Sequence, residues 1–125
     1  LDRLLARVVI GPPASAAVIA SLAPARPAVL ECFEKAFHLG RTLAFTYVDR
    51  NGATSRREVE PHGLLVQVPA WYVLGLDVAR ALPRMFRLDR ISRPAVLEQA
   101  FTPRPFTVFE PLLTDVRDRT TLSAR

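Results

Sequence analysis

Three short blocks of sequence decide how this chain folds: Arg57-Glu-Val-Glu-Pro-His-Gly-Leu64, Trp71-Tyr-Val-Leu74 and Arg84-Met-Phe-Arg-Leu-Asp-Arg-Ile91. Apolar residues alternate in them with arginines, and such a two-residue period is typical of β-strands. A Trp-Tyr pair lies between the two arginine-bearing blocks. The blocks contain neither a nucleophile–base pair nor a cluster of metal ligands. They therefore predict a strand-built surface that holds an anionic ligand, rather than a catalytic centre.

The sequence around these blocks predicts five short strands. Residues 41–47 alternate in polarity, and the following Asp49-Arg-Asn-Gly52 predicts a hairpin turn because Asn-Gly readily adopts positive φ. A long second strand, residues 56–67, is expected to bend or bulge at Pro61 and Gly63. The remaining strands are expected at residues 71–78, 84–91 and 94–99.

One helix is expected before the strands. Leu30, Phe33 and Phe37 form an apolar stripe over residues 28–39, and Gly40 is a typical residue just past a helix C-terminus. A helix followed by five bent strands at regular spacing predicts an α+β fold. In that fold the N-terminal helix packs on a small, closed, five-stranded antiparallel β-barrel, because closure removes exposed strand edges.

Composition is that of one folded domain. The chain has 125 residues, half of them hydrophobic, which is enough to bury a core. The net charge is +5, and 16 of the 17 basic residues are arginines, the exception being Lys35. A drift from Lys to Arg in a GC-rich genome explains this bias without any function. The functional interpretation is that guanidinium groups suit phosphates and stack on bases.

Other features of the sequence limit the class of protein. The single cysteine, Cys32, excludes an internal disulfide and fits a reducing cytoplasm. No apolar run approaches the roughly 20 residues that a membrane helix needs. A signal peptide over residues 3–23 is opposed by Pro12-Pro13 in its apolar part. The only methionine is Met85, so we expect a fragment of a longer protein.

The two ends are expected to flank the domain. Residues 1–27 are interpreted as an arm from a preceding region, with helical spacing over residues 1–10 and an Ala/Pro-rich stretch after it. Residues 103–125 are interpreted as a C-terminal extension or linker. It is expected to be extended over residues 101–109 and partly helical or loose over residues 111–125.

Strand alternation assigns side chains to faces. Trp71, Phe45, Phe86 and Leu88 are expected in the core, and Arg87 is expected to be exposed. Tyr72 then faces the other way, either to bind a ligand by stacking or to pack under the helix. Arg90 falls on the Phe86 face, and such a break in the pattern tends to mark a site. The alternative is a solvated face with ordinary ion pairs.

Catalysis is not expected. His62 follows a proline at the strand bend, where a lone histidine is more often structural than catalytic. Two histidines and one cysteine would need carboxylates at unusual spacing to bind zinc. The sequence has no P-loop and no Gly-rich dinucleotide turn. We therefore expect no catalytic residues, no metal site and no cofactor.

The three blocks resemble the WYL domain family in order and spacing. The family is named for a Trp-Tyr-Leu run, which here reads Trp71-Tyr72-Val73, and the resemblance covers about residues 28–102. It implies an Sm/SH3-like small β-barrel. It also implies an effector-sensing module of a bacterial transcriptional regulator, with nucleic acids or nucleotides as ligands. Such domains commonly follow a winged helix-turn-helix, which this chain lacks, so a DNA-binding domain is expected outside it.

The resemblance also implies a ligand face. The chain departs from the family pattern at Val73 and in the turn Val68-Pro-Ala70. The leading hypothesis is a cytoplasmic domain that binds single-stranded nucleic acid or a nucleotide. The alternative is a structural module that mediates homodimerisation, and an enzyme or a membrane protein is not expected. The expected ligand-binding residues are Arg57, His62, Tyr72, Arg84, Arg87 and Arg90.

Overall fold

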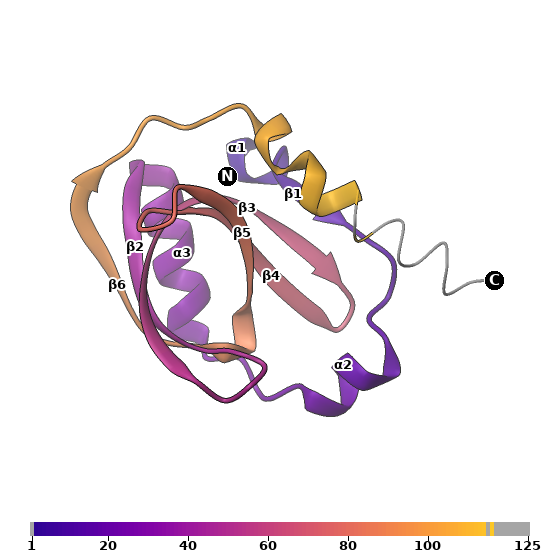
Figure 1. The fold of residues 1–125 in the computed structure, drawn as a ribbon. Coiled ribbons are helices and arrows are strands. Elements are labelled where there is room, and N and C mark those ends of the chain that lie inside the picture. Colours follow the sequence, from indigo (N-terminus) through magenta and orange to yellow (C-terminus); the bar gives the residue numbers. More distant parts are fainter. Residues whose placement is uncertain (1, 115, 117–125) are drawn as a thin grey trace.

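The computed structural model describes residues 2–114 and 116 and has an α+β fold (Figure 1). A helix packs on a bent sheet, short elements near the C-terminus pack on part of its other face, and a short strand near the N-terminus is added at one edge. The sheet follows the order β5-β4-β3-β2-β6, with neighbours antiparallel, and β1 is added beside β3. The strands are β1 (Val8–Ile10), β2 (Arg41–Val48), β3 (Thr54–Gln67), β4 (Ala70–Asp77), β5 (Leu82–Arg87) and β6 (Ile91–Ala100).

The predicted helix is confirmed as α3 (Pro27–Leu39), which packs against β2, β3 and β6. Its inward face buries Val29, Phe33 and Phe37, while Leu30 is only partly buried. Gly40 ends the helix with φ of 65°, in the left-handed region that glycine adopts at little cost. The change from helical to strand period at this glycine is therefore read correctly from sequence.

The predicted hairpin turn between β2 and β3 is also confirmed. The Asp49 carboxylate accepts hydrogen bonds from the backbone N–H groups of Asn51 (2.8 Å) and Ala53 (3.0 Å). Gly52 has φ of 83°, so the glycine of the Asn-Gly pair supplies the positive φ that the turn requires.

β3 bends where Pro61 and Gly63 predict it, because the β3–β4 register shifts between these two residues. Before the bend β3 pairs with β2, and after it Leu64 pairs with Val8 of β1 in parallel. The bend turns β3 away from β2 and leaves an open edge, which β1 covers. Residues 8–10 therefore form a strand, not the helix that their spacing predicted, and α1 (Asp2–Leu5) is a single turn.

The closed five-stranded barrel expected from the sequence is not found. The sheet has six strands and is open along its path, with β5 and β6 at the two ends. Residues 88–90, predicted as strand, form the 3₁₀ turn η1 (Leu88–Arg90), so Arg90 does not share a strand face with Phe86. The Arg87 N–H donates to the Tyr47 hydroxyl (3.1 Å), so a side chain and not a strand pair links β5 to β2 here.

Two apolar clusters lie on opposite faces of the sheet. The faces can be assigned because residues opposite each other on paired strands share a face. Val73 is opposite Phe86 in the main cluster with α3, whereas Leu74 is opposite Met85 in the second. The second cluster is completed from the C-terminal end by η2 (Phe106–Phe109) and by helical residues 110–114 and 116. The predicted partly helical extension is thus packed on the sheet as far as it is described, and residues 117–125 lie outside the described residues.

Two burial predictions are wrong, whereas Phe45, Phe86 and Leu88 are buried as predicted. Trp71 is 40% exposed because it lies near the tip of the β3–β4 hairpin, beyond the main core. Arg87 is only 6% exposed. The arm between β1 and α3 contains α2 (Ala16–Ser21). It crosses the end of β5 and covers the guanidinium group of Arg87.

The C-terminal cluster generates a stability prediction. Phe109 is fully buried between the sheet and the His62 ring, so Phe109→Ala should lower the free energy of unfolding by roughly 3–5 kcal/mol. Leu82→Ala, at a side chain that is 53% exposed, is the control and should cost much less. Chemical denaturation measures both, and equal losses would show that the C-terminal segment does not hold the core.

Candidate functional site

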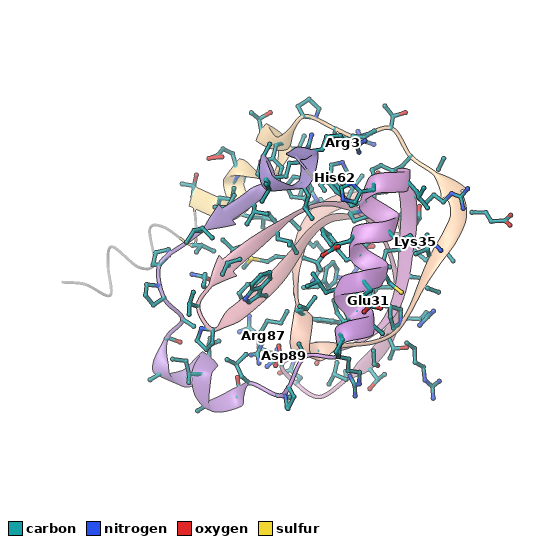
Figure 2. The ribbon with its side chains drawn as sticks, turned by 180° about the vertical axis from the view of Figure 1, so that it is seen from behind. Arg3, Glu31, Lys35, His62, Arg87 and Asp89 are labelled. Carbon is teal, nitrogen blue, oxygen red and sulfur yellow. The ribbon has the colours of Figure 1, made fainter. Side chains whose placement is uncertain are left out.

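The six residues predicted for the ligand face fall into three groups. Arg57 and Arg84 lie on the main-core face beside Phe86. Tyr72 and Arg87 lie opposite each other on β4 and β5, on the second face, with Arg90 just beyond on η1. His62 lies beside Arg3, at the end of the molecule away from Arg87 and Asp89 (Figure 2). The structure thus brings five of the six near β5 and leaves His62 apart.

Arg57, Arg84 and Tyr47 surround the Phe86 ring and form what we term the rim cluster. The guanidinium carbons of Arg57 and Arg84 lie 5.8 Å and 5.9 Å from the ring centroid. The Tyr47 ring meets Phe86 edge to face, with 5.1 Å between centroids. Phe86 is buried, whereas the three surrounding side chains are half-buried. Aromatic faces stabilise guanidinium groups by cation–π attraction and leave their N–H groups available.

The two rim arginines differ in their partners. Arg57 donates to the Asp77 carboxylate (3.3 Å) and to the Ser55 hydroxyl (2.9 Å), so part of its charge is neutralised. Arg84 has no hydrogen bond or ion pair within the described part of the chain. Arg57 also borders a groove of about 580 Å³ that Arg56 and Arg80 line as well. The rim cluster is therefore a half-buried cationic site with aromatic walls.

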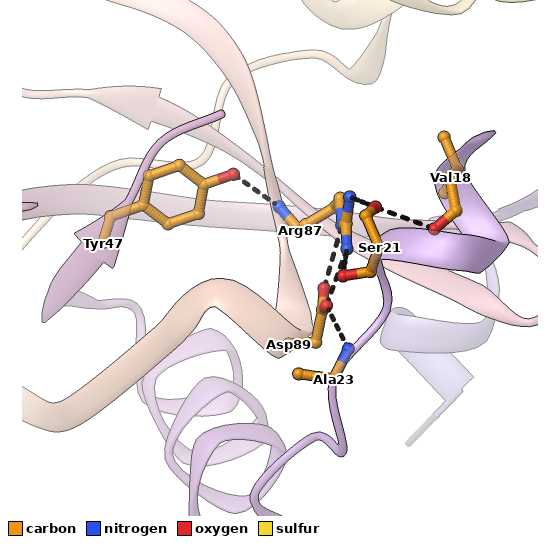
Figure 3. Close-up of polar contacts among 6 residues, drawn as sticks. All are labelled: Val18, Ser21, Ala23, Tyr47, Arg87 and Asp89. Atoms are coloured by element: carbon orange, nitrogen blue, oxygen red, sulfur yellow. Dashed lines mark hydrogen bonds and ion pairs between the residues drawn. The ribbon is translucent and has the colours of Figure 1, made fainter. Parts of the chain in front are cut away.

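Arg87 forms a buried ion pair with Asp89, and Figure 3 shows how the arm closes over it. Arg87 Nε donates to Asp89 Oδ1 (3.0 Å), and Nη2 donates to Oδ2 (2.7 Å). The same guanidinium donates to the Ser21 hydroxyl (2.9 Å) and the Ser21 carbonyl (3.2 Å). Asp89 in turn accepts from the Ala23 N–H at 3.0 Å. We call these four residues the clasp, because they fasten the arm to the sheet.

The clasp perturbs the ionisation of both its charged members. The hydrogen bond to Asp89 raises the pKa of Arg87. Burial opposes the charge on Asp89, but the hydrogen bonds from Arg87 and Ala23 outweigh it and lower the pKa of that carboxyl. Burial raises the pKa of the Tyr72 phenol, while the charge of Arg87 acts in the opposite direction. Tyr72 therefore stays a neutral phenol that packs against the second cluster.

Both ring nitrogens of His62 form hydrogen bonds with the backbone, as is typical of a structural histidine. Its Nε2 accepts from the Arg104 N–H (3.0 Å), which requires an unprotonated Nε2. Its Nδ1 lies 2.8 Å from the Glu60 carbonyl oxygen and so carries the proton. The ring packs against Phe101 and Phe109, with both centroid distances 5.2 Å. Burial lowers the pKa of His62, and the charges of Arg7 and Arg104 act in the same direction.

Sequence reasoning missed two parts of this arrangement. Tyr47 lies on the predicted strand 41–47, and its place two residues after Phe45 on the same face was a usable signal. Ser21 carries no such signal, because it contacts Arg87 across 66 residues of sequence.

No group of three or more His, Cys, Asp or Glu side chains suited to a metal ion occurs among the residues described here. Nor does the described chain contain a helix long and apolar enough to cross a membrane.

Comparison with known proteins identifies relatives. A model of the WYL domain matches residues 28–96. The chain is 37% identical over 60 residues to the uncharacterized HTH-type transcriptional regulator YobV of Bacillus subtilis (strain 168), covering 48% of this chain and 19% of that protein. Its fold is similar to proteasome accessory factor B/C (PafBC) of Arthrobacter aurescens, with a TM-score of 0.59 and 32% identity over 68% of this chain. The match covers 14% of the PafBC chain, so this chain corresponds to a small part of either relative.

The environment of His62 predicts a pH dependence. Because its folded pKa lies below the usual 6.5, the folded state disfavours protonation relative to the unfolded chain. This contribution to stability should be complete above about pH 6.5 and be lost as the pH falls through the folded pKa. Chemical denaturation between pH 5 and 8 should show that the free energy of unfolding falls as the pH is lowered. The fall should be smaller in His62→Asn.

The clasp predicts that Arg87 is needed for stability, contrary to the expectation from sequence. Arg87→Ala leaves Asp89 buried without its cation and should cost about 3 kcal/mol or more. Arg84→Ala removes the same charge at a half-buried position without an ion pair among the described residues and serves as the control. Urea denaturation at pH 7 compares the two variants, and equal losses would contradict a structural role for the clasp.

Proposed function

The chain belongs to the WYL domain family, and on that premise we propose that it is the ligand-sensing domain of a bacterial transcriptional regulator. Its proposed effector is anionic, either single-stranded nucleic acid or a nucleotide. The YobV relative is named as an HTH-type transcriptional regulator, and this chain corresponds to about a fifth of it. We therefore propose that a helix-turn-helix domain outside these residues binds DNA and that the whole regulator acts in the cytoplasm.

The observation that carries this proposal is the rim cluster. Arg57 and Arg84 approach one aromatic ring, and the partly exposed Tyr47 ring adjoins it. Guanidinium groups bind phosphate oxygens through paired N–H donors, and an exposed aromatic face stacks on a base. Arg84 makes no hydrogen bond or ion pair among the described residues. The groove beside Arg57 adds the guanidinium groups of Arg56 and Arg80, and the carboxylates of Glu58 and Asp77 line it as well. This arrangement suits one or a few nucleotides bound at a small, positively charged surface.

Tyr72 and Arg90 are proposed as a second ligand contact, at the end of β5 and away from the face that carries Arg57 and Arg84. Tyr72 and Arg90 lie within electrostatic range of each other, next to the Arg87 backbone that Tyr47 contacts. His62 lies apart from these residues. We propose that it contributes to ligand binding only indirectly, by stabilising the bend of β3. We also propose that the domain binds without catalysis, because the rim cluster offers cations and rings and no general base beside a nucleophile.

A dimerisation module without its own ligand is the second candidate. Ile10, Val68 and Trp71 are 71%, 61% and 40% exposed at the tip of the β3–β4 hairpin. Ile10 and Trp71 flank Val66 from its two neighbouring strands, so these apolar side chains lie close together. Exposed apolar patches of this kind mark protein contacts in other domains. Concentration-dependent association without any binding of anions would favour this second function.

Titration of a fluorescent single-stranded oligonucleotide at several salt concentrations tests the proposal. Arg57→Ala and Arg84→Ala should each weaken binding and lower the slope of log affinity against log salt by about 0.7, since each lost phosphate contact releases one counterion fewer. Arg41→Ala removes an exposed charge at the far end of β2 and should leave both quantities near wild type. A cyclic dinucleotide titrated in parallel distinguishes a nucleotide effector from a strand. Equal affinities of the wild type and both rim variants would contradict the proposal.

A further inference from the structure

The arm, residues 11–26, is attached to the sheet mainly by hydrogen bonds. α2 has no buried residue, and the arm as a whole is exposed or half-buried. Near its ends the Ala14 N–H donates to the Val68 carbonyl (3.1 Å) and Arg26 donates to the Ile91 carbonyl (3.2 Å). Its centre is held by the clasp. A segment that buries little apolar surface opens at low free-energy cost, so the arm is a candidate for local release.

The clasp uses nearly all the binding capacity of Arg87. A guanidinium has five N–H groups. Arg87 makes four contacts, two to Asp89 and two to Ser21, which account for Nε, Nη2 and one hydrogen of Nη1. Its side chain is 7% exposed beneath the arm. In this state no paired set of N–H donors remains on Arg87 for a phosphate.

We propose that residues Ser21 to Ala23 act as an internal competitor of the effector: with Asp89 they occupy Arg87, and an anion that binds Arg87 releases the arm. This proposal rests on the proposed function and names its regulation. The Ser21 hydroxyl and carbonyl oxygens, together with the Asp89 carboxylate, present to Arg87 the set of acceptor oxygens that a phosphate would present. Closed arm and bound anion are then mutually exclusive states.

The surroundings of Arg87 favour an anion once the arm leaves. Arg90 follows on η1 and has no hydrogen bond or ion pair in the described chain, and Tyr72 lies opposite Arg87 on β4. Release would free the two N–H groups of Arg87 that donate to Ser21, beside the Arg90 guanidinium and the Tyr72 phenol. Asp89 remains on Nε and on the other N–H of Nη2. The Tyr47 hydroxyl, which accepts from the Arg87 N–H, joins this place to the rim cluster. Release also lets water reach Asp89, whose charge is otherwise satisfied by Arg87 and Ala23.

The molecule contains its own reporter of arm position. Trp71 is the only tryptophan of the chain and is 40% exposed. It borders a groove of about 390 Å³ together with Leu22, Ala23 and Asp89. Departure of the arm removes one wall of this groove and exposes the indole to water. Trp71 emission should therefore shift to longer wavelength when the arm is released.

The test uses the 125-residue chain and a single-stranded DNA of about ten nucleotides, a length within the range that small β-folds cover. Ala23→Pro removes the backbone N–H that donates a hydrogen bond to Asp89, and it leaves the side chains of Arg87 and Asp89 unchanged. Leu22 is already extended, with ψ of 138°, as a residue before proline must be. Ser21→Ala removes one acceptor of Arg87 and is the second variant. Ser92→Ala, at a β6 side chain without a hydrogen bond in the described residues, is the control.

Three measurements give the expected result. Ala23→Pro and Ser21→Ala should bind the DNA about fivefold or more tightly than wild type, because coupling between two sites is reciprocal and commonly of this size. Both should already show shifted Trp71 emission and faster amide exchange over residues 14–25 without DNA. The wild type should show these two changes only when DNA is added, and Ser92→Ala should match the wild type throughout.

Several outcomes overturn the inference. Faster exchange in the arm of Ala23→Pro and Ser21→Ala with unchanged or weaker DNA affinity would show that arm and anion do not compete. DNA binding to the wild type without change in arm exchange or Trp71 emission would show the same. If Arg57→Ala weakens binding while the arm variants do not strengthen it, the proposed function stands and the competition fails. If neither the wild type nor Ala23→Pro, each folded, binds the DNA or a cyclic dinucleotide, both proposals fail together.

Discussion

β3 bends at Gly63, where a Cβ atom would lie 2.5 Å from the Arg7 carbonyl oxygen and 2.8 Å from the Phe106 ring. Only glycine permits this approach of three segments from distant parts of the sequence. The bend separates β3 from β2, opens the edge that β1 covers, and turns His62 into the interior, where Arg104 and Glu60 satisfy both ring nitrogens. The close contact thus brings a residue near each end of the chain, Arg7 and Phe106, against the bend of β3.

The clasp positions the arm more than it stabilises the fold, because a buried ion pair stabilises a fold poorly relative to apolar packing. Desolvation of Arg87 and Asp89 consumes most of their attraction, and apolar side chains of similar volume would serve as well or better. What the pair adds is direction. Apart from their bonds to each other, the two side chains bond among the described residues only to Ser21 and Ala23, which fixes the position of the arm. The same polar contacts can be exchanged for those of an anion, which apolar packing cannot do.

The arginines show that residue type alone does not decide function. Arg57, Arg84 and Arg87 occur in similar strand contexts in the sequence, yet their partners differ. Arg87 is closed beneath the arm, and Arg57 shares its charge with Asp77. Among the described residues Arg84 is attracted only to an aromatic ring. Availability to an external anion increases in that order, because each hydrogen bond already made must be given up on binding. The proposed effector site therefore depends on these internal contacts as much as on net charge.

The sequence by itself determined the elements whose causes are local. The apolar stripe before Gly40, the Asn-Gly turn and the Pro61–Gly63 bend each depend on the backbone preferences of neighbouring residues, and all three are confirmed. Only the tertiary structure decided the open sheet with its added β1, the exposure of Trp71 and the burial of Arg87. Alternation along a strand tells which side chains share a face, but not what covers that face. The cover of Arg87 comes from Ser21, 66 residues away, and no local pattern encodes a contact of that range.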